Sequence, residues 1–316
     1  MRIKKIFQSF KPKIKHLLGV DLSSNSIRLV ELSGFGSGYQ VEACINIALD
    51  TSASDDVVIE ALKKTFEQKL IKTKNVAVAL PHAAIVFKEI KIASGLTDKE
   101  IENFLQFNME KYVGETAENI SFDYQIIEMP IKNGGQMALQ LVVARREHVE
   151  KLIKPLWAVN LSPRVVDVDS SALERAVRRQ LKDIVGLVAI INIDNESILI
   201  VVIDRKKIIH TQKSPLREEE MQTLDQIMTR LKLKMQPVAV ALRQPLEKIV
   251  LAGEKALFPG LLEVINVQFN VPAMVADPFE GMKLSAAISQ EEAQKIAPAM
   301  LISCGLALRL TDVNWN

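Results

Sequence analysis

Two stretches far apart in this chain follow the same strand–turn–strand pattern. The stretch GVDLSSNSIRLV at residues 19–30 aligns without a gap with IINIDNESILIV at residues 190–201. Three equivalent positions carry related residues: Leu22 and Ile193, Ser26 and Ser197, and Ile27 and Ile198. Each stretch has an apolar run, a short polar turn and a second apolar run, which is typical of a buried β-hairpin. The repeat predicts two halves of related architecture, each beginning with a hairpin.

The remaining apolar pattern predicts alternating strands and helices, as in an α/β protein. Strands are expected at residues 17–22, 27–32, 39–49, 76–80, 84–92, 122–128, 137–144, 163–168, 185–193, 197–204, 207–212, 249–251 and 273–276. Helices are expected at residues 55–70, 146–159, 170–181, 217–235, 260–269 and 297–310. One more helix is expected to begin at Thr97 and end near residue 113, because Glu100 three residues after Thr97 predicts a reciprocal N-terminal cap.

The composition is that of an ordinary globular protein. The chain has 316 residues, 48% hydrophobic and 25% charged, enough to bury cores for two domain-sized units. A net charge of +2, with no nucleic-acid motif, argues against nucleic acid as a partner. Cys44 and Cys304 lack metal-ligand spacing, so both are expected to be buried, reduced thiols. The four histidines are scattered and define neither a metal site nor a catalytic pair: His16, His82, His148 and His210.

The first residues form a basic segment. Residues 1–16 hold several Lys and Arg residues and no acid, and their apolar residues recur at helical spacing. Residues 2–15 are therefore candidates for a short amphipathic turn that contacts anionic lipid. The alternative is a solvated terminus without a membrane role. Because the apolar stretches of the chain are too short to cross a bilayer, we expect a cytoplasmic protein.

Several stretches resemble those of the PilM family of type IV pilus assembly proteins, within the superfamily of actin, sugar kinases and FtsA. They occur in the order of the family and span nearly the whole chain: GVDLSSNSIRLVEL (19–32), GLTDKEIENFLQFNMEKYV (95–113), VVDVDSSALERA (165–176), KIVLAGEKALFPGL (248–261), ADPFEGM (276–282) and PAMLISCGLALR (298–309). The last three are the most specific, because they are not generic α/β patterns.

The resemblance implies an actin-like ATPase (ribonuclease H-like) fold of class α/β, with two lobes and an FtsA-type α+β extra subdomain. The expected division is a basic N-terminal segment at 1–16, a first actin-like lobe at 17–81, the inserted subdomain at 82–165, and the second lobe with the C-terminal helix at 166–316.

The resemblance also implies a function. The protein is expected to be an adaptor without enzymatic activity, peripheral at the inner membrane. Its expected partner is the short cytoplasmic N-terminal tail of a PilN-like inner-membrane protein. By binding this tail, the adaptor is expected to link the PilN/PilO complex to pilus motor components. Two alternatives stay open, a nucleotide-switched actin-like ATPase and the equivalent adaptor of a related pilus or type II secretion system.

Actin-like relatives often bind ATP between their lobes. In such a cleft, glycines in the turns let backbone amides approach the phosphates, and an aspartate in each hairpin organises Mg²⁺. The candidate cofactor-binding residues at these positions, of which the first is also the candidate metal ligand, are Asp21, Ser23, Ser24, Asn192, Asp194, Gly253 and Glu254.

Several of these residues depart from what a nucleotide requires. Ser23 stands at the expected glycine of the first turn, and Asn192 replaces the acid of the second hairpin. Asp194 places a negative charge where phosphate oxygens would lie. In the later Ala-Gly-Glu turn, which the resemblance assigns to the adenosine, Glu254 replaces the second of two adjacent glycines.

The sequence therefore predicts a cleft that has lost its nucleotide function. The actin-like relatives carry a longer helical segment after the second hairpin, whereas the region between residues 211 and 249 here has room for only one or two helices. The resemblance therefore implies a reduced second lobe. We expect no ATP or Mg²⁺ cofactor and no ATP hydrolysis. In the simplest interpretation, Asp21 caps its hairpin turn, and Asp194 and Glu254 are solvated turn residues.

Overall fold

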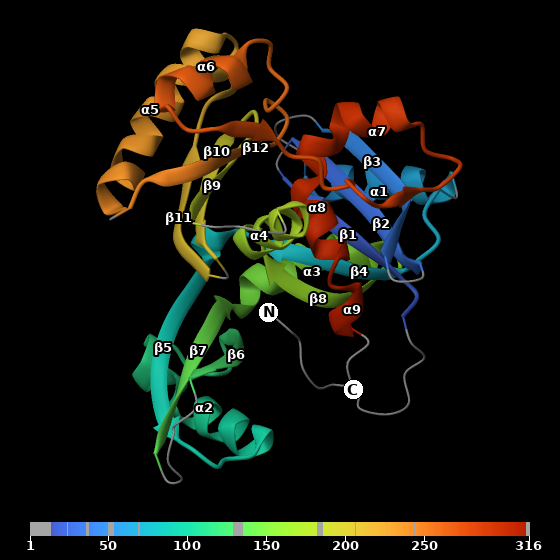
Figure 1. Cartoon of the computed structure of the whole chain (residues 1–316). Coiled ribbons are helices and arrows are strands. Elements are labelled where there is room, and N and C mark those ends of the chain that lie inside the picture. Colours follow the sequence, from blue (N-terminus) through green and yellow to red (C-terminus); the bar gives the residue numbers. More distant parts are fainter. Residues whose placement is uncertain are drawn as a thin grey trace.

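The structure is a computed structural model that describes residues 14–23, 25–35, 38–49, 54–68, 70–128, 135–181, 186–205, 207–242 and 244–313. Two large sheets, with helices between and outside them, form the body of the molecule, and a small third sheet projects away from it (Figure 1). The two large sheets with the helices that cover their outer faces are the first and second lobes.

The first lobe is built on a six-stranded sheet in the order β14-β3-β2-β1-β4-β8. Its strands are β1 (His16–Leu22), β2 (Ser26–Phe35), β3 (Gly38–Ala48), β4 (Asn75–Leu80), β8 (Ser162–Val168) and β14 (Lys283–Leu284). The first three pair antiparallel, whereas β4 and β8 follow in parallel. Helices α1 (Asp55–Glu67) and α3 (Arg146–Ala158) cover one face, where Leu62 and Leu156 pack among the strand residues.

The second lobe repeats this plan. Its sheet has the order β11-β10-β9-β12-β13, which corresponds to β3-β2-β1-β4-β8 of the first lobe. Its strands are β9 (Leu187–Ile193), β10 (Ser197–Asp204), β11 (Lys207–Pro215), β12 (Leu246–Ala252) and β13 (Ala273–Val275). Helices α5 (Leu224–Ala241) and α6 (Leu261–Phe269) cover its outer face. The two related halves predicted from the repeated hairpin are thus confirmed, and the match extends to five strands in each lobe.

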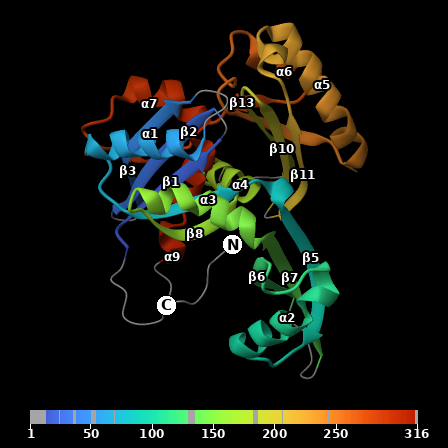
Figure 2. The same ribbon diagram turned by 180° about the vertical axis from the view of Figure 1, so that it is seen from behind.

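Two helices, α4 (Asp169–Gln180) and α8 (Leu301–Ala307), lie between the sheets (Figures 1 and 2). Every residue of α8 is buried. Two glycines allow this close packing. A Cβ at Gly19 of β1 would lie 1.8 Å from a backbone oxygen of α8, and a Cβ at Gly305 of α8 would lie 1.9 Å from a backbone oxygen of α4. The close spacing between α8 and its neighbours therefore requires that positions 19 and 305 be glycine, which has no side chain.

The small sheet carries the inserted α+β unit. Its elements are β5 (Ile85–Ala93), α2 (Asp98–Val113), β6 (Ile120–Glu128) and β7 (Gln136–Arg145), preceded by the 3-10 helix η1 (His82–Ala84). The strand order is β5-β7-β6, and α2 packs on one face. The predicted cap is confirmed, because Glu100 N donates to Thr97 Oγ1 at 3.4 Å and Thr97 N donates to Glu100 Oε2 at 2.7 Å.

One expected helix differs from the structure. The segment at 217–235 is divided into the 3-10 helix η2 (Glu218–Met221) and α5, and α5 continues through Pro237 to Ala241. A proline removes one helical hydrogen bond, and here it stands in the last turns of the helix. Buried Val238 follows it, so packing against the second sheet extends the helix beyond the local stop signal.

The C-terminal region also has more elements than expected. The predicted helix at 297–310 is broken into η3 (Ala297–Met300), α8 and α9 (Leu310–Val313). The strand β14 and helix α7 (Gln290–Ile296) precede it and were not predicted. A two-residue strand and a short, mainly polar helix leave too little apolar periodicity for sequence detection.

Strand pairing divides the chain differently from the boundaries expected from the sequence. The boundary at residue 165 falls inside β8, which pairs with β4 in the first lobe. β14 pairs with β3 of the same sheet, and α8 packs closely on β1. Much of the C-terminal region therefore belongs with the first lobe, because these contacts are made between segments distant in the sequence.

Two expectations concern membranes. The lipid contact expected at residues 2–15 falls almost entirely on residues 1–13, which lie outside the described residues. In the described part of the chain, no helix combines the length and apolar character that a membrane crossing requires.

Candidate functional site

The hairpin turns of the two lobes have matching geometry. Ser23 N donates to Ser26 O at 3.0 Å in the β1–β2 turn, and Asp194 N donates to Ser197 O at 3.0 Å in the β9–β10 turn. The flanking residues pair in the same register: Leu22 opposite Ile27, and Ile193 opposite Ile198. The alignment made from the sequence is therefore confirmed residue by residue.

A buried arginine joins these two turns. Arg28 of β2 is 1% exposed, and its Nη1 donates to Asp21 Oδ2 at 3.1 Å. Its Nη2 donates to Asp194 Oδ1 at 3.0 Å and to Glu254 Oε1 at 2.9 Å. We call Arg28, Asp21, Asp194 and Glu254 the Arg28 cluster. Arg28 and Asp21 come from the first lobe and the other two from the second, so the cluster spans the cleft between the lobes.

The charges in the cluster are unequal. Burial alone would lower the pKa of Arg28, but the carboxylates of Asp194, Asp21 and Glu254 outweigh it and raise that pKa, so the guanidinium stays protonated. Burial raises the pKa of Asp21, and the nearby Asp194 charge acts in the same direction, against the opposing effect of Arg28. Three acids thus share one arginine, and with all carboxylates ionised the four groups carry an excess of negative charge.

Two asparagines hold the second-lobe carboxylates in place. Asn192 Nδ2 donates to Asp194 Oδ2 at 2.7 Å, and Asn195 Nδ2 donates to Glu254 Oε2 at 2.6 Å. Glu254 N also donates to Asp194 Oδ1 at 3.3 Å. Each carboxylate therefore has one oxygen bound to a side-chain amide and the other bound to Arg28, which fixes its orientation.

The remaining candidate residues serve the turns. Ser23 Oγ donates to Asn25 Oδ1 at 3.0 Å and lies 2.8 Å from Ser26 Oγ. Ser24 lies outside the described residues. Gly253 has a φ of 90°, and a Cβ there would lie 2.4 Å from a backbone oxygen at the end of β9. This glycine is therefore required for packing one turn against another.

The residues present do not fit a Mg²⁺–nucleotide group. A phosphate needs free backbone amides and a positive environment. In the two hairpin turns that would approach the phosphates, Ser23 N is bound to Ser26 O and Asp194 N to Ser197 O, each at 3.0 Å. In the later turn, Glu254 N is bound to Asp194 Oδ1 at 3.3 Å and Lys255 N to Ile193 O at 3.0 Å. One oxygen of each of the three carboxylates is bound to Arg28, which places a cation where a metal ion would have to lie.

The structure corrects part of the simplest interpretation. Asp194 and Glu254 are not solvated turn residues, since their side chains are 13% and 18% exposed and both bind Arg28. The side chain of Asp21 binds the same guanidinium, and in the turn itself Ser26 N donates to Ser23 Oγ at 3.0 Å. Arg28 and Asn195 were missed from the sequence. The available signal was Arg28 itself, a charged residue inside an apolar strand and directly opposite Asp21 in the hairpin register.

Two surface pockets differ in whether a residue of the Arg28 cluster lines them. A pocket of about 230 Å³ adjoins the cluster and is lined by Asn46, Glu254, Leu257 and Lys295 among others. It is smaller than the roughly 300–1,000 Å³ typical of small-molecule sites. Its size gives no independent reason to expect a nucleotide there.

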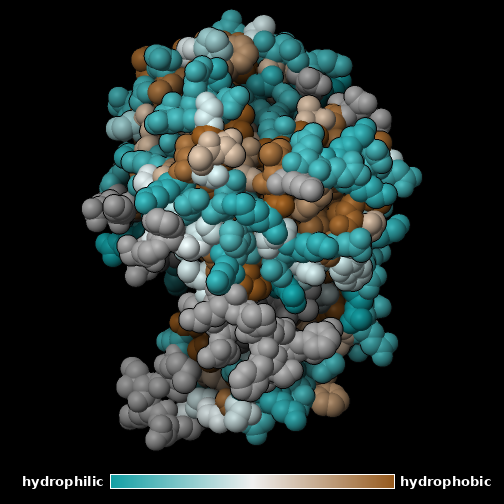
Figure 3. All heavy atoms as spheres, turned by 90° about the vertical axis from the view of Figure 1, so that its right-hand side faces the viewer, coloured by the Kyte–Doolittle hydropathy of each residue, from teal (hydrophilic) through white to brown (hydrophobic). Residues whose placement is uncertain are grey.

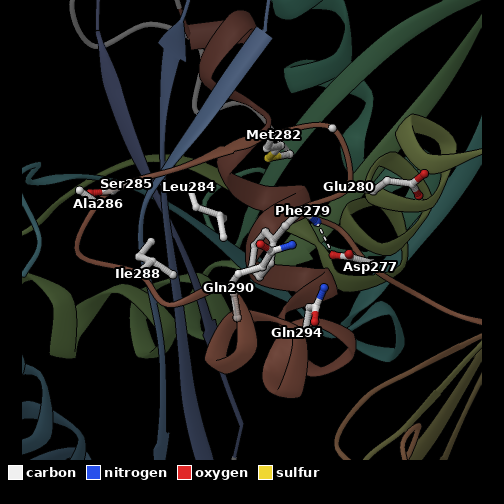
Figure 4. Close-up of a pocket in the computed structure, with 12 residues that line it drawn as sticks. Asp277, Phe279, Glu280, Met282, Leu284, Ser285, Ala286, Ile288, Gln290 and Gln294 are labelled. Carbon is white, nitrogen blue, oxygen red and sulfur yellow. Dashed lines mark hydrogen bonds between the residues drawn. The ribbon is translucent and has the colours of Figure 1, made fainter.

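The larger pocket lies on the first lobe, away from the cluster. It has a volume of about 530 Å³ and lies between the loop of residues 277–288 and α7 (Figure 4). Residues of the family-like ADPFEGM motif line it, and Phe279 N donates to Asp277 Oδ1 at 3.0 Å within the loop. Seen from the side that carries α7 and β3, the surface is mainly hydrophilic, with hydrophobic residues gathered near its middle (Figure 3).

The two cysteines lie where they stay protonated. Cys304 is buried as predicted and Cys44 is half-buried, and both are free. Burial raises the pKa of Cys44 to about 11 and that of Cys304 to about 12, which keeps both as thiols. Within the described ranges, no set of His, Cys, Asp and Glu side chains is arranged to hold a metal ion.

Comparison with known proteins agrees with this architecture. The family described as "Type IV pilus assembly protein PilM" matches residues 19–237 and 220–311. A chain of a "PilM-PilN type IV pilus biogenesis complex" is similar with a TM-score of 0.77 and 20% identity, over 95% of this chain and 99% of that chain. The ethanolamine utilization protein EutJ from Carboxydothermus hydrogenoformans is similar with a TM-score of 0.55 and 13% identity, over 97% of this chain and 93% of that chain. The actin-like fold is thereby confirmed, and because the family match covers most of the sequence, the chain belongs to the PilM family of type IV pilus assembly proteins.

Proposed function

We propose that this protein is a non-catalytic adaptor in type IV pilus assembly that binds the cytoplasmic N-terminal tail of a PilN-like inner-membrane protein. The observation that carries the proposal is the family match over most of the chain, together with similarity to nearly the full length of a chain from a PilM–PilN complex. Through that tail, the adaptor is held peripherally at the inner membrane and links a PilN/PilO complex to pilus motor components.

The Arg28 cluster supports a binding role over a catalytic one. A nucleotide-switched ATPase is the second candidate, because the two-lobed fold leaves a cleft between its lobes. Hydrolysis requires a bound metal ion and phosphate-binding amides at that cleft. Here Asp21, Asp194 and Glu254 are bound to an arginine, and the hairpin-turn amides of Ser23 and Asp194 are bound within the protein. Peptide recognition does not need these groups.

The first prediction concerns the partner. A synthetic peptide of the cytoplasmic tail of the PilN-like protein from the same organism should bind with one-to-one stoichiometry in isothermal titration. The affinity for the peptide should be equal with no nucleotide, with Mg-ADP and with Mg-ATP, because we expect the cleft not to bind nucleotide. A peptide of the same composition in scrambled order is the matched control.

The alternatives give different results in the same titration. Tail binding that changes with Mg-ATP would support the nucleotide-switched ATPase. Binding only to the corresponding tail from a related pilus or a type II secretion system would assign the adaptor to that system. Failure of every tail to bind would contradict the proposed function.

A further inference from the structure

The Arg28 cluster ties three turns together through one side chain. Asp21 and Arg28 face each other across β1 and β2 of the first lobe. Asp194 follows β9, and Glu254 follows β12, in the second lobe. Both second-lobe carboxylates accept from the same Nη2 atom, at 3.0 and 2.9 Å. The guanidinium is therefore the point at which the facing turns of the two lobes meet.

The cation is needed for the lobes to lie this close. All three carboxylates lie within hydrogen-bond distance of one guanidinium, and their side chains are at most 18% exposed. Like charges repel strongly where water is largely excluded. Removal of one partner from a buried ion pair leaves the remaining charge uncompensated. Without a cation, the second-lobe acids would be driven away from Asp21.

We propose that Asp21, Asp194 and Glu254 form a cation site that Arg28 fills permanently from within, so that the lobes stay closed without a metal ion or a nucleotide. The ligand that fits this site is a planar guanidinium cation. If Arg28 is shortened, the site accepts a free guanidinium compound or a hard divalent cation, because carboxylate oxygens are ligands for both.

The shape of the site explains the choice of arginine. A guanidinium offers N–H donors in a planar fork, so its two terminal nitrogens bind carboxylates on two sides at once. Asn192 and Asn195 hold Asp194 and Glu254 with one oxygen each toward Arg28. A lysine ammonium is a single point charge and cannot reach both lobes in the same way. Arginine also keeps its proton at every physiological pH, so the cation itself is not lost when the pH changes.

The same site excludes nucleotides. Its three carboxylates exceed its one guanidinium, so a polyphosphate would meet negative charge at the facing turns. The carboxylates that hold Arg28 are thus the same groups that repel a nucleotide. This inference is independent of the partner, since it concerns how the lobes are held and would stand even if no tail peptide bound.

Cation rescue of Arg28→Ala is the decisive experiment. The variant should unfold at lower urea concentration than the unmodified protein. Millimolar methylguanidinium, or Mn²⁺, should raise the unfolding midpoint of the variant and leave that of the unmodified protein unchanged. At a cation concentration of about 100 times its dissociation constant, the ratio of folded to unfolded variant should rise about 100-fold. Mn²⁺ binding to the folded variant is measured directly by electron paramagnetic resonance.

A matched control is Arg164→Ala. Arg164 is an exposed arginine of β8 that donates to Asn75 Oδ1 at 2.9 Å, away from the three carboxylates. This variant removes the same side chain, and neither cation should change its unfolding midpoint. Mg-ATP should leave the midpoint of the unmodified protein unchanged.

A second variant keeps the test decisive if Arg28→Ala does not fold. In the combined variant Arg28→Leu, Asp21→Asn, Asp194→Asn and Glu254→Gln, no carboxylate remains to be neutralised. It should be more stable than Arg28→Leu alone and should bind neither Mn²⁺ nor methylguanidinium.

Three outcomes would each overturn the proposal. The first is a folded Arg28→Ala protein that binds neither cation, and the second is a combined variant no more stable than Arg28→Leu. The third is stabilisation of the unmodified protein by Mg-ATP.

Discussion

Replacement of Gly305 or Gly19 by alanine is expected to destabilise the protein by about 3 kcal/mol or more, because overpacking here meets backbone rather than a movable side chain. A Cβ at Gly305 would lie 1.9 Å from a backbone oxygen of α4, and one at Gly19 would lie 1.8 Å from a backbone oxygen of α8. Helix α8 would have to move away from a core that it shares with both lobes. The loss at Gly305 should occur although alanine favours helix formation by about 1 kcal/mol over glycine.

Urea unfolding followed by circular dichroism measures this effect. Gly34→Ala is the matched control, since Gly34 is in strand β2 and a Cβ there would meet nothing within 4 Å. Its unfolding midpoint should equal or slightly exceed that of the unmodified protein, because alanine lowers the entropy of the unfolded chain. A Gly305→Ala protein more stable than the unmodified one would show that α8 does not pack as closely as described.

The second large effect is expected at Asp167. This residue of β8 is 2% exposed, and its Oδ2 accepts from Arg175 at 2.9 Å and from Arg309 at 2.8 Å. It thereby joins the first sheet to α4 and to the segment after α8. Asp167→Asn should lower the free energy of unfolding by about 3–5 kcal/mol, because two guanidinium groups would lose their shared carboxylate.

The same substitution gives a pH signature. Burial alone would raise the pKa of Asp167, but Arg175 and Arg309 outweigh it and hold that pKa well below its ordinary value of 3.8. The stability from a carboxylate of lowered pKa is fully present above the ordinary value and is lost as the pH falls through the folded-state value. The difference in unfolding free energy between the unmodified protein and Asp167→Asn should therefore be constant near neutral pH and decrease below about pH 4.

An exposed ion pair is the control for this prediction. Glu60 and Lys64 lie one helical turn apart on α1, with a separation of 3.7 Å and side chains 60% and 69% exposed. Glu60→Gln should leave the unfolding midpoint nearly unchanged, since exposed pairs contribute little to stability. An Asp167→Asn effect as small as that of Glu60→Gln would contradict the central role given to Asp167.

Local sequence determined the repeated elements. The hairpins at residues 19–30 and 190–201 were found from apolar runs around a short polar turn, and their register follows from turn length. The cap at Thr97 was found because its two partners are three residues apart. These features depend on neighbours in the chain, so periodicity and turn chemistry are enough to predict them.

Part of the candidate site was also determined by the sequence. The positions of Asp21, Asp194, Gly253 and Glu254 were identified from resemblance and from the repeat, and the three acids do lie at one place between the lobes. The hairpin register alone places Arg28 opposite Asp21. The sequence could therefore have predicted one ion pair of the Arg28 cluster.

Only the tertiary structure decided what the other acids do. Arg28 and Glu254 are 226 residues apart in the sequence, and their contact exists because the two sheets close on α4 and α8. The same closure removes water from the carboxylates, which turns expected solvated turn residues into partners of a buried cation. The sequence determined which charges this protein carries, and the packing of the two lobes determined which of them meet.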